Sequence, residues 1–372
     1  MRRRNMKKVI IGALLSAVMI ANVLTGCGSA AGEATASASN TEEKAEDKAA
    51  GTGELTHLEV AASANMVSSG LNVIAKYGGF YEEEGLDVNL NAINGSSYAP
   101  LLTGKLDVTA GGASEPLMLI DKGNPLVMFG GAMGNGANLY CLPERADEFK
   151  ELTQETLSGK KIGTTRGTSG LFALFDWFKK QGIDTSEIEI VELDAPPTIV
   201  EAVRKGEVDL GVIYLTFRNT AEEQGFYNVA YIDELEDFIC CRLTTTTDKL
   251  KADRDTYVHF LKANIKAYRV YKTDEDKAVE LMKNFLEIDE SVIRNQLYEY
   301  GHLVLNPNPE KDRIIAFYDS MFDLGYVEDN VNIGEYVDIS IFEDAITQLL
   351  EEEPDDPTFK ELYEQFKATN TQ

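Results

Sequence analysis

The chain has few of the residues that build metal centres, disulfide frameworks and catalytic dyads. Its 372 residues include four cysteines and three histidines. The cysteines are Cys27, Cys141, Cys240 and Cys241. The histidines are His57, His259 and His302. The cysteines do not have metal-site spacing, and no histidine falls in a loop that ends a predicted strand. The sequence therefore predicts no metal site, no cofactor and no enzymatic activity.

Positive charge is also scarce. Lysine and arginine number 35 against 62 aspartates and glutamates, which gives a formal net charge of −27 at pH 7. Nucleic acids and anionic lipid headgroups both require a basic surface, so this balance argues against them as direct partners. It says little about a small ligand, because the local field of a binding site can differ from the surface average.

The basic residues that do occur early form part of a leader. Arg2–Arg4, Lys7 and Lys8 precede the apolar run Val9–Leu24, which ends in Leu-Thr-Gly before Cys27. A charged start and a short apolar segment are typical of an export signal, and Leu-Thr-Gly-Cys resembles the bacterial lipoprotein box. We expect residues 1–26 to be a lipoprotein signal peptide and Cys27 to be lipidated, outside the cytoplasm of a bacterium. An ordinary signal peptide or an uncleaved anchor is the alternative.

Residues 27–53 have the composition of a tether. Gly28–Gly53 contains no aromatic or large aliphatic side chain, so it cannot bury enough apolar surface to offset the entropy of ordering. From Glu54 onward the chain is long enough for two lobes with separate cores. In an exported protein Cys141 could pair with Cys240 or Cys241, although buried inert thiols are the default.

Two stretches of the chain repeat one pattern. The apolar run Leu58–Ala62 leads through a polar loop to Ser68–Leu71, and Lys161–Thr165 leads in the same way to Thr168–Leu171. Each continues as helix, strand, helix and strand. Parallel sheets with crossover helices follow from this order, so we predict an α/β fold with two similar lobes.

The polar loops fall where such sheets bind ligands, beyond the carboxyl ends of their strands. A helix that starts there presents unpaired backbone N–H groups. The ligand-binding residues expected in lobe one are Asn65, Ser68, Ser69, Gly112, Ala113 and Ser114. Those expected in lobe two are Arg166, Thr168, Ser169, Tyr214 and Thr216.

Two strand-like crossings are expected to join the lobes. We predict that Ala137–Leu142 pairs with Phe238–Thr246, with hinges near Leu142 and Asp237. Lobe one then comprises residues 54–142 and 238–372, and lobe two residues 143–237. The glycine-rich residues 130–136 are expected to form a loop, and the helical pattern after residue 254 to cover lobe one.

Several of these segments resemble a known family. They are Gly70–Ala75, Gly79–Val88, Leu157–Gly163 and Gly206–Asp209. With the lipoprotein box and tether, they resemble substrate-binding lipoproteins of ABC importers, in the branch that binds nitrate, sulfonates, taurine or thiamine-pyrimidine precursors. The resemblance implies a type II periplasmic-binding-protein-like fold with two hinge strands. It also implies a monomer that closes on one small solute and delivers it to a permease with a cytoplasmic ATPase.

The ligand itself is left open by these motifs, which are scaffold motifs. Arg166 with Thr168 and Ser169 favours a sulfonate, nitrate or taurine-like organic anion. Glu115 and the acidic surface favour a neutral or cationic heterocycle, such as a thiamine-pyrimidine precursor, and Arg166 could instead point to solvent. A sensor subunit shares this sequence pattern. Relatives of this fold also include a pyrimidine synthase that uses a cysteine-rich motif and a histidine. Cys240 and Cys241 are the nearest approach to that motif in this sequence, and its neighbouring residues are absent.

Overall fold

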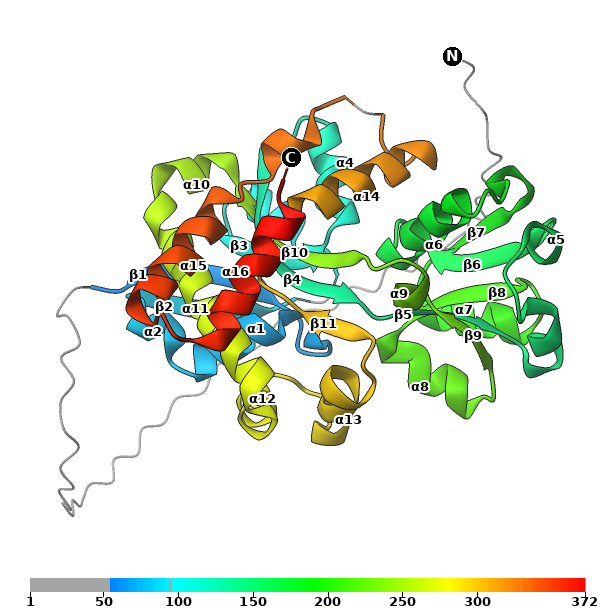
Figure 1. Ribbon diagram of the computed structural model, residues 1–372, viewed down its shortest axis with the longest axis horizontal. Helices are drawn as coiled ribbons and strands as arrows, with labels where there is room; N and C mark the ends of the chain where they lie inside the picture. Colours follow the sequence, from blue (N-terminus) through cyan, green and yellow to red (C-terminus); the bar gives the residue numbers. More distant parts are fainter. Residues whose placement is uncertain (1–53, 94, 329, 372) are drawn as a thin grey trace, which may run out of the picture. The chain divides into compact units, whose positions relative to one another are not determined.

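The strands form two separate sheets, as the computed structural model in Figure 1 shows. It describes residues 54–93, 95–328 and 330–371, so the leader, the tether and Cys27 lie outside the described residues. The first sheet has six strands in the order β11-β4-β10-β3-β1-β2, and the second has five in the order β7-β6-β8-β5-β9. The first contains β1 (Thr56–Ala62), β2 (Leu86–Ala92), β3 (Val108–Gly112), β4 (Leu126–Asn135), β10 (Ile239–Thr246) and β11 (Leu303–Leu305). The second contains β5 (Ala137–Cys141), β6 (Lys161–Thr165), β7 (Glu189–Leu193), β8 (Leu210–Tyr214) and β9 (Tyr227–Tyr231).

Each sheet contains the predicted parallel unit. β1 pairs in parallel with β2 and β3, and β6 pairs in parallel with β7 and β8. Helices make the crossovers, as parallel neighbours require. The remaining strands of each sheet pair antiparallel, so both sheets are mixed.

Helices connect and cover the strands. Up to β10 they are α1 (Gly70–Tyr77), α2 (Phe80–Glu83), α3 (Tyr98–Leu102), α4 (Ser114–Asp121), α5 (Gln154–Leu157), α6 (Ser169–Lys180), α7 (Pro196–Arg204), α8 (Leu215–Glu223) and α9 (Ile232–Leu235). After β10 they are α10 (Thr247–Ala252), α11 (Arg254–Thr273), α12 (Glu275–Met282), α13 (Glu290–Arg294), α14 (Lys311–Asp323), α15 (Ser340–Glu352) and α16 (Pro357–Thr369). Short 3-10 turns are η1 (Val67–Ser69), η2 (Pro143–Phe149), η3 (Thr185–Glu187) and η5 (Ile333–Tyr336), and η4 (Asn295–Glu299) is a π-helical turn.

Local sequence explains many of the helix ends. Proline starts α7, where its fixed φ suits the first turn, and Gly206 follows the helix with a φ of +69°. The Asp356 carboxylate accepts hydrogen bonds from Thr358 N–H at 2.8 Å and Phe359 N–H at 3.0 Å at the start of α16. No helix within the described residues is long and apolar enough to cross a membrane.

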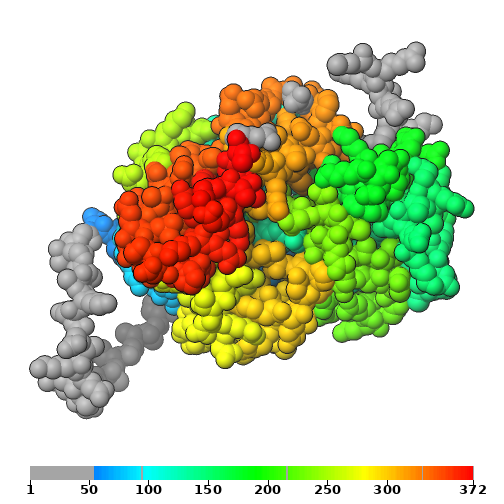
Figure 2. Space-filling model, viewed as in Figure 1, coloured from blue at the N-terminus to red at the C-terminus, as the bar shows by residue number. Residues whose placement is uncertain are grey.

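The C-terminal helices pack mainly on the first sheet. The long helix α11 contacts α1, α2 and α15, and its apolar face joins the core around β1 and β4. In Figure 2 the red and orange C-terminal residues cover much of the face shown over this sheet. Helix α14 differs, because it packs on α6 of the second sheet, where the Phe172 and Phe317 rings lie 5.0 Å apart. The second hydrophobic core therefore continues from one sheet into the other.

Two predictions about the connection between the sheets were wrong. β5 pairs with β8 and β9 of the second sheet, and β10 pairs with β4 and β3 of the first. The glycine-rich residues 130–136 are not a loop, because β4 continues to Asn135. A methyl group placed on Gly131 would overlap the Asn308 carbonyl oxygen, so glycine here permits close backbone approach rather than a turn.

The first crossing therefore lies at Asn135 and Gly136, not near Leu142. Both residues are left-handed, with φ values of +62° and +89°, and they separate β4 from β5. The second crossing lies between α9 and β10. The two crossings are bonded to each other, since Asn135 N–H donates to the Phe238 carbonyl at 3.0 Å and Phe238 N–H donates to Asn135 Oδ1 at 2.9 Å.

Candidate solute-binding site

The loop after β1 holds three of the predicted site residues. Asn65 is exposed, whereas Ser68 and Ser69 are buried in η1. The Ser69 hydroxyl accepts a hydrogen bond from the Ser63 backbone N–H at 3.1 Å, so Ser69 stabilises its own loop. Of the three, Ser68 lines a cavity between the two sheets.

The loop after β3 brings the first sheet close to the second. Gly112 is exposed, and the buried Ala113 donates its backbone N–H to the Cys240 carbonyl oxygen at 2.7 Å. Ser114 is half-buried at the start of α4. A methyl group placed on Gly167, in the loop after β6, would lie 3.7 Å from the Ser114 hydroxyl oxygen. The predicted loops of the two sheets therefore meet at Ser114 and Gly167.

The loop between β6 and α6 carries the predicted cation. Arg166 is exposed and makes no hydrogen bond or ion pair with another residue of the described ranges. Burial raises the pKa of Tyr326, and the positive charge of Arg166 opposes that rise, so the two side chains are neighbours. Thr168 is half-buried, and its hydroxyl shares a 2.8 Å hydrogen bond with the Thr164 hydroxyl. Arg166 is therefore available to a solute at the surface of this loop.

The N-terminus of α6 is capped by a side chain from a neighbouring strand. Tyr214, the last residue of β8, accepts a hydrogen bond from the Gly170 backbone N–H at 2.6 Å. Removal of its hydroxyl from water raises the Tyr214 pKa well above the ordinary value, so this group is neutral at physiological pH. Ser169 is buried beside the Tyr214 hydroxyl, and Thr216 follows in the first turn of α8.

A small cavity lies where these elements converge. Its volume is about 20 Å³, which is room for about one water molecule. Its wall comprises Met66, Val67, Ser68, Met133, Gly136, Tyr214, Gln296 and Leu303. These residues come from the β1 loop, β4, the first crossing, the end of β8, the π-helical turn and β11. Ser68 and Tyr214 are the predicted site residues in this wall.

Contacts from the C-terminal third of the chain hold the two sheets together next to this cavity. Arg218 in α8 donates from Nη2 to Asn295 Oδ1 in η4 at 2.9 Å, and its guanidinium lies 4.1 Å from the centre of the Tyr300 ring. The Tyr300 hydroxyl donates to Asn138 Oδ1 in β5. These side chains bridge the second sheet to the turn that leads into β11.

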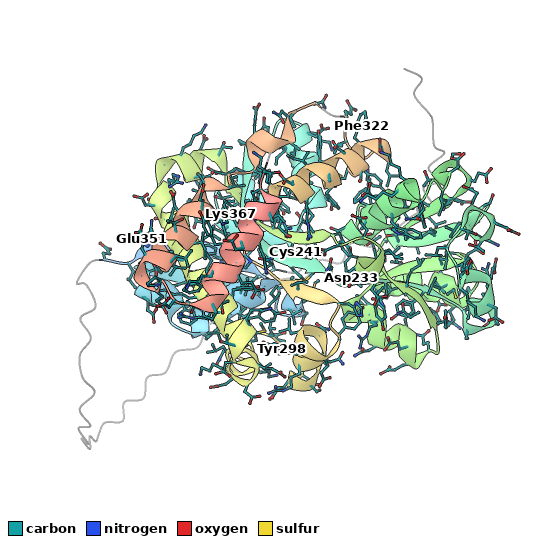
Figure 3. All side chains as sticks on the ribbon, in the orientation of Figure 1. Asp233, Cys241, Tyr298, Phe322, Glu351 and Lys367 are labelled. Atoms are coloured by element: carbon teal, nitrogen blue, oxygen red, sulfur yellow. The ribbon has the colours of Figure 1, made fainter. Side chains whose placement is uncertain are left out.

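A histidine extends the same bridge. The His302 ring stacks on Tyr231 of β9 with ring centres 3.7 Å apart, and His302 Nδ1 lies 2.8 Å from Asp233 Oδ2. Asp233, which Figure 3 labels, lies on α9, and its partner His302 immediately precedes β11. We call these contacts the interlobe bridge. It joins Asn138, Arg218, Tyr231 and Asp233 on one side to Asn295, Tyr300 and His302 on the other.

A second set of contacts joins the sheets at α14. The Tyr326 hydroxyl donates to Glu192 of the second sheet at 2.5 Å, and its ring packs edge-on against Phe172 of α6 with centres 5.0 Å apart. Lys179 of α6 pairs with Asp323 of α14. The cavity therefore lies in a region where the two sheets are in direct contact.

Most of the cavity wall was missed by the sequence interpretation. Met66 is adjacent to the predicted loop and could have been included on that ground. Gln296 and Leu303 lie in a segment whose pattern indicates only amphipathic helices, so no local signal identifies them. Asn65 and Gly112 are exposed outside this wall, and Arg166, Thr168 and Ser169 are not part of it.

The three cysteines of the described residues are buried free thiols, and two of them lie unusually close together. Adjacent residues of a regular strand point to opposite faces, but the sulfur atoms of Cys240 and Cys241 in β10 are 3.6 Å apart. Shifts in the β10–β4 register on both sides of Cys241 explain this, because a bulge breaks the alternation of side chains. Both are buried free thiols, as is Cys141, whose pKa burial raises to about 11. Within the described ranges, no group of three or more His, Cys, Asp or Glu side chains is placed to hold a metal ion.

Comparison with known proteins supports the fold and the resemblance. The periplasmic aliphatic sulphonate binding protein SsuA of Escherichia coli shares the fold with a TM-score of 0.62 at 17% identity, covering 76% of this chain and 97% of that one. The periplasmic nitrate-binding protein NrtA of Synechocystis PCC 6803 matches with a TM-score of 0.63 at 13% identity, over 80% and 89% of the two chains. The predicted periplasmic-binding-protein-like α/β fold is confirmed. The fold is also that of the desulfurization enzyme DSZB, at 12% identity and a TM-score of 0.55.

Sequence comparison agrees with these structures. A binding protein of Brucella abortus (strain 2308) is 23% identical over 245 residues, which are 64% of this chain and 74% of the relative. The family model described as NMT1/THI5 like matches residues 68–278, more than half of the chain. The resemblance inferred from residues 70–88 and 157–209 is confirmed, and the chain belongs to the NMT1/THI5-like family.

Proposed function

We propose that this protein is the extracytoplasmic solute-binding component of an ABC importer. The observation that carries the proposal is the convergence of the β1 loop, the first crossing and the end of β8 on one cavity between the two sheets. The matched sulphonate-binding and nitrate-binding proteins support it by analogy. The protein would act as a monomer and deliver its solute to a permease that is driven by a cytoplasmic ATPase.

Solute capture in this proposal requires the sheets to separate and close again. A cavity of about 20 Å³ accommodates about one water molecule, which is too small for an organic solute. The two crossings at Asn135–Gly136 and residues 236–238 are the segments that would turn. The interlobe bridge would open and re-form, and solute contacts made only in the closed form would favour closure.

The solute is a small polar compound, and we favour a sulfonate, nitrate or taurine-like organic anion. Exposed Arg166, which has no ion pair among the described residues, and the hydroxyl of Thr168 are the groups that would receive the acid. A neutral heterocycle is the second candidate. It is favoured by the cavity wall, since none of its eight residues is charged.

We propose no catalytic role. His57, His259 and His302 each lie beside a carboxylate, and none of them lines the cavity. The residues upstream of Glu54 would act as an export leader (1–26) and a tether (27–53), with lipid attached to Cys27, so that the protein stays at the outer face of the membrane or in the periplasm.

A ligand screen with two loop variants tests the proposal. Sulfonates, small carboxylates, nitrate and pyrimidines are screened by thermal shift, because a ligand that binds the folded state raises the melting temperature. For an acidic ligand, Arg166→Ala should weaken binding by about 1.5–3 kcal/mol, the usual contribution of a hydrogen bond to a charged group. Ser114→Ala should weaken binding of any ligand held between the loops.

Arg204→Ala is the matched control, since Arg204 is exposed on α7 and pairs with Glu201 of the same helix. Calorimetry should give the parent dissociation constant for this control. If Arg166→Ala and Ser114→Ala also bind like the parent and fold normally, the site is elsewhere.

A further inference from the structure

Two buried polar side chains in the cavity wall have no partner in the described part of the chain. Ser68 is 6% exposed and Gln296 is 8% exposed, and neither side chain forms a hydrogen bond with a described residue. Both line the cavity. Neither residue is among those with a fully buried, unpaired polar atom, so the polar atoms of both side chains remain accessible and can bond to a group that enters the cavity.

The surroundings of these two groups are apolar and uncharged. Met66, Val67, Met133 and Leu303 supply most of the remaining wall. Tyr214 completes it, and its hydroxyl is neutral because its pKa is raised by removal from water. An ionised group placed against such a wall would lose its hydration without meeting an opposite charge. A hydroxyl, amide or ring nitrogen of a solute would instead meet uncharged hydrogen-bonding groups, those of Ser68 and Gln296.

Gln296 is positioned by the interlobe bridge. It lies on the π-helical turn η4, in which Tyr300 N–H bonds to the Asn295 carbonyl at 2.8 Å. Asn295 and Tyr300, the residues at the two ends of this bond, contact Arg218 and Asn138 of the second sheet. Wide turns of this kind are frequent at functional sites. The turn also lies beyond residues 68–278, the stretch that the family model matches.

We infer that Gln296 and Ser68 are specificity-determining residues that select an uncharged hydrogen-bonding group of the solute. The Gln296 amide offers both donors and an acceptor, and the Ser68 hydroxyl offers one donor and two lone pairs. A solute that carries an acid can direct it to Arg166, outside this wall, while its neutral group enters the cavity. The inference rests on the proposed solute-binding function and adds the class of group that the site prefers.

Two pairs of probes isolate the neutral group. Ethanesulfonate and 2-hydroxyethanesulfonate differ by one hydroxyl, and pyrimidine and 4-aminopyrimidine differ by one amino group. In at least one pair, the parent protein should bind the hydroxyl or amino member about three- to tenfold more tightly, the usual range for a neutral hydrogen bond. Gln296→Met keeps the size of the side chain and removes the amide, so it should abolish this preference by weakening binding of the hydroxyl or amino member more than binding of the simpler probe.

Matched variants show whether a lost preference between the probes reflects the removed side chain or a folding defect. Gln181→Met makes the same change at the exposed end of α6 and should retain the parent preference. Ser68→Ala should reduce the preference in the same direction, and it provides the comparison if Gln296→Met does not fold. Melting temperature and calorimetry are measured for each variant.

The outcomes distinguish this inference from the proposed function. The inference is overturned if the protein binds both members of a pair equally. It is also overturned if the preference persists in Gln296→Met and Ser68→Ala. Either result leaves the proposed solute binding intact. A parent protein that binds none of the four probes also overturns the inference, whereas the wider screen of sulfonates, carboxylates, nitrate and pyrimidines decides the proposed function.

Discussion

Replacing Arg218 by methionine should weaken solute binding even though Arg218 is not part of the cavity wall. Arg218 belongs to α8, which follows β8 of the second sheet, whereas Asn295 and Tyr300 belong to the turn before β11 of the first sheet. Its 2.9 Å hydrogen bond and its 4.1 Å ring contact therefore stabilise only the state in which the sheets are together. Methionine keeps much of the apolar packing and removes the charge.

The size of the effect follows from these two contacts. A hydrogen bond from a charged group contributes about 1.5–3 kcal/mol, and a cation–π contact contributes about 0.5–2 kcal/mol. Two effects reduce the net contribution of these contacts. Water would solvate the guanidinium once the sheets separate, and the ion pair with Glu222, 3.4 Å away in the same helix, is present in both states. The net change in the closing free energy is then about 1.5–3 kcal/mol, or about tenfold to a hundredfold in the closing equilibrium. The apparent dissociation constant should rise by up to this factor.

Calorimetry with the solute from the screen measures the dissociation constant, and small-angle scattering measures the radius of gyration. Arg218→Met should show weaker binding and a larger ligand-free radius than the parent. Arg204→Met is the control, because Arg204 is exposed and its partner Glu201 lies in its own helix. Equal dissociation constants and equal radii for the two variants would show that the interlobe bridge does not contribute to closure.

Three further changes give direct tests. Arg242→Met should lower the free energy of unfolding by about 1.5–3 kcal/mol in urea titrations, since buried Glu310 loses a charged hydrogen-bond donor and keeps its pair with Arg313; equal midpoints would contradict this. Burial opposes ionisation of Glu84, but a hydrogen bond from His259 and neighbouring lysines lower its pKa below 4.5. The stability advantage of the parent over Glu84→Gln should thus be full at pH 7 and disappear as the pH falls through that lowered pKa; an advantage independent of pH would refute it. Cys27→Ser should release the protein from the membrane fraction of cells, and unchanged association would indicate an uncleaved anchor.

The parallel part of each sheet could be predicted because its signals are local. Alternating apolar residues, glycines after short helices and the double proline at 196–197 mark strands and helix ends within a few residues. The same local pattern located the β1 loop, which contains Ser68 of the cavity wall. Ser114 was found in the same way, and it does lie opposite Gly167 of the second sheet.

The course of the chain between the sheets could not be predicted from local signals. Gly130 and Gly131 indicate a loop by composition, yet they lie inside β4 because Leu261 and the backbone of Asn308 approach them closely. That contact joins segments far apart in the sequence. Without it, the strand Ala137–Cys141 could be placed equally well in either sheet, and pairing it with β10 was the wrong choice.

The N-terminus of α6 shows why a correct motif still gave an incomplete site. A polar loop that opens a helix has unpaired N–H groups, and the sequence interpretation assigned them to a solute. In the fold, Gly170 N–H is already paired with the Tyr214 hydroxyl, 44 residues away in the sequence. A hydroxyl that accepts one hydrogen bond can still donate another. Tyr214 therefore satisfies the helix and is also one of the residues that line the cavity, so the wall includes Tyr214 and Gln296 but no residue of the β6 loop that the motif identified.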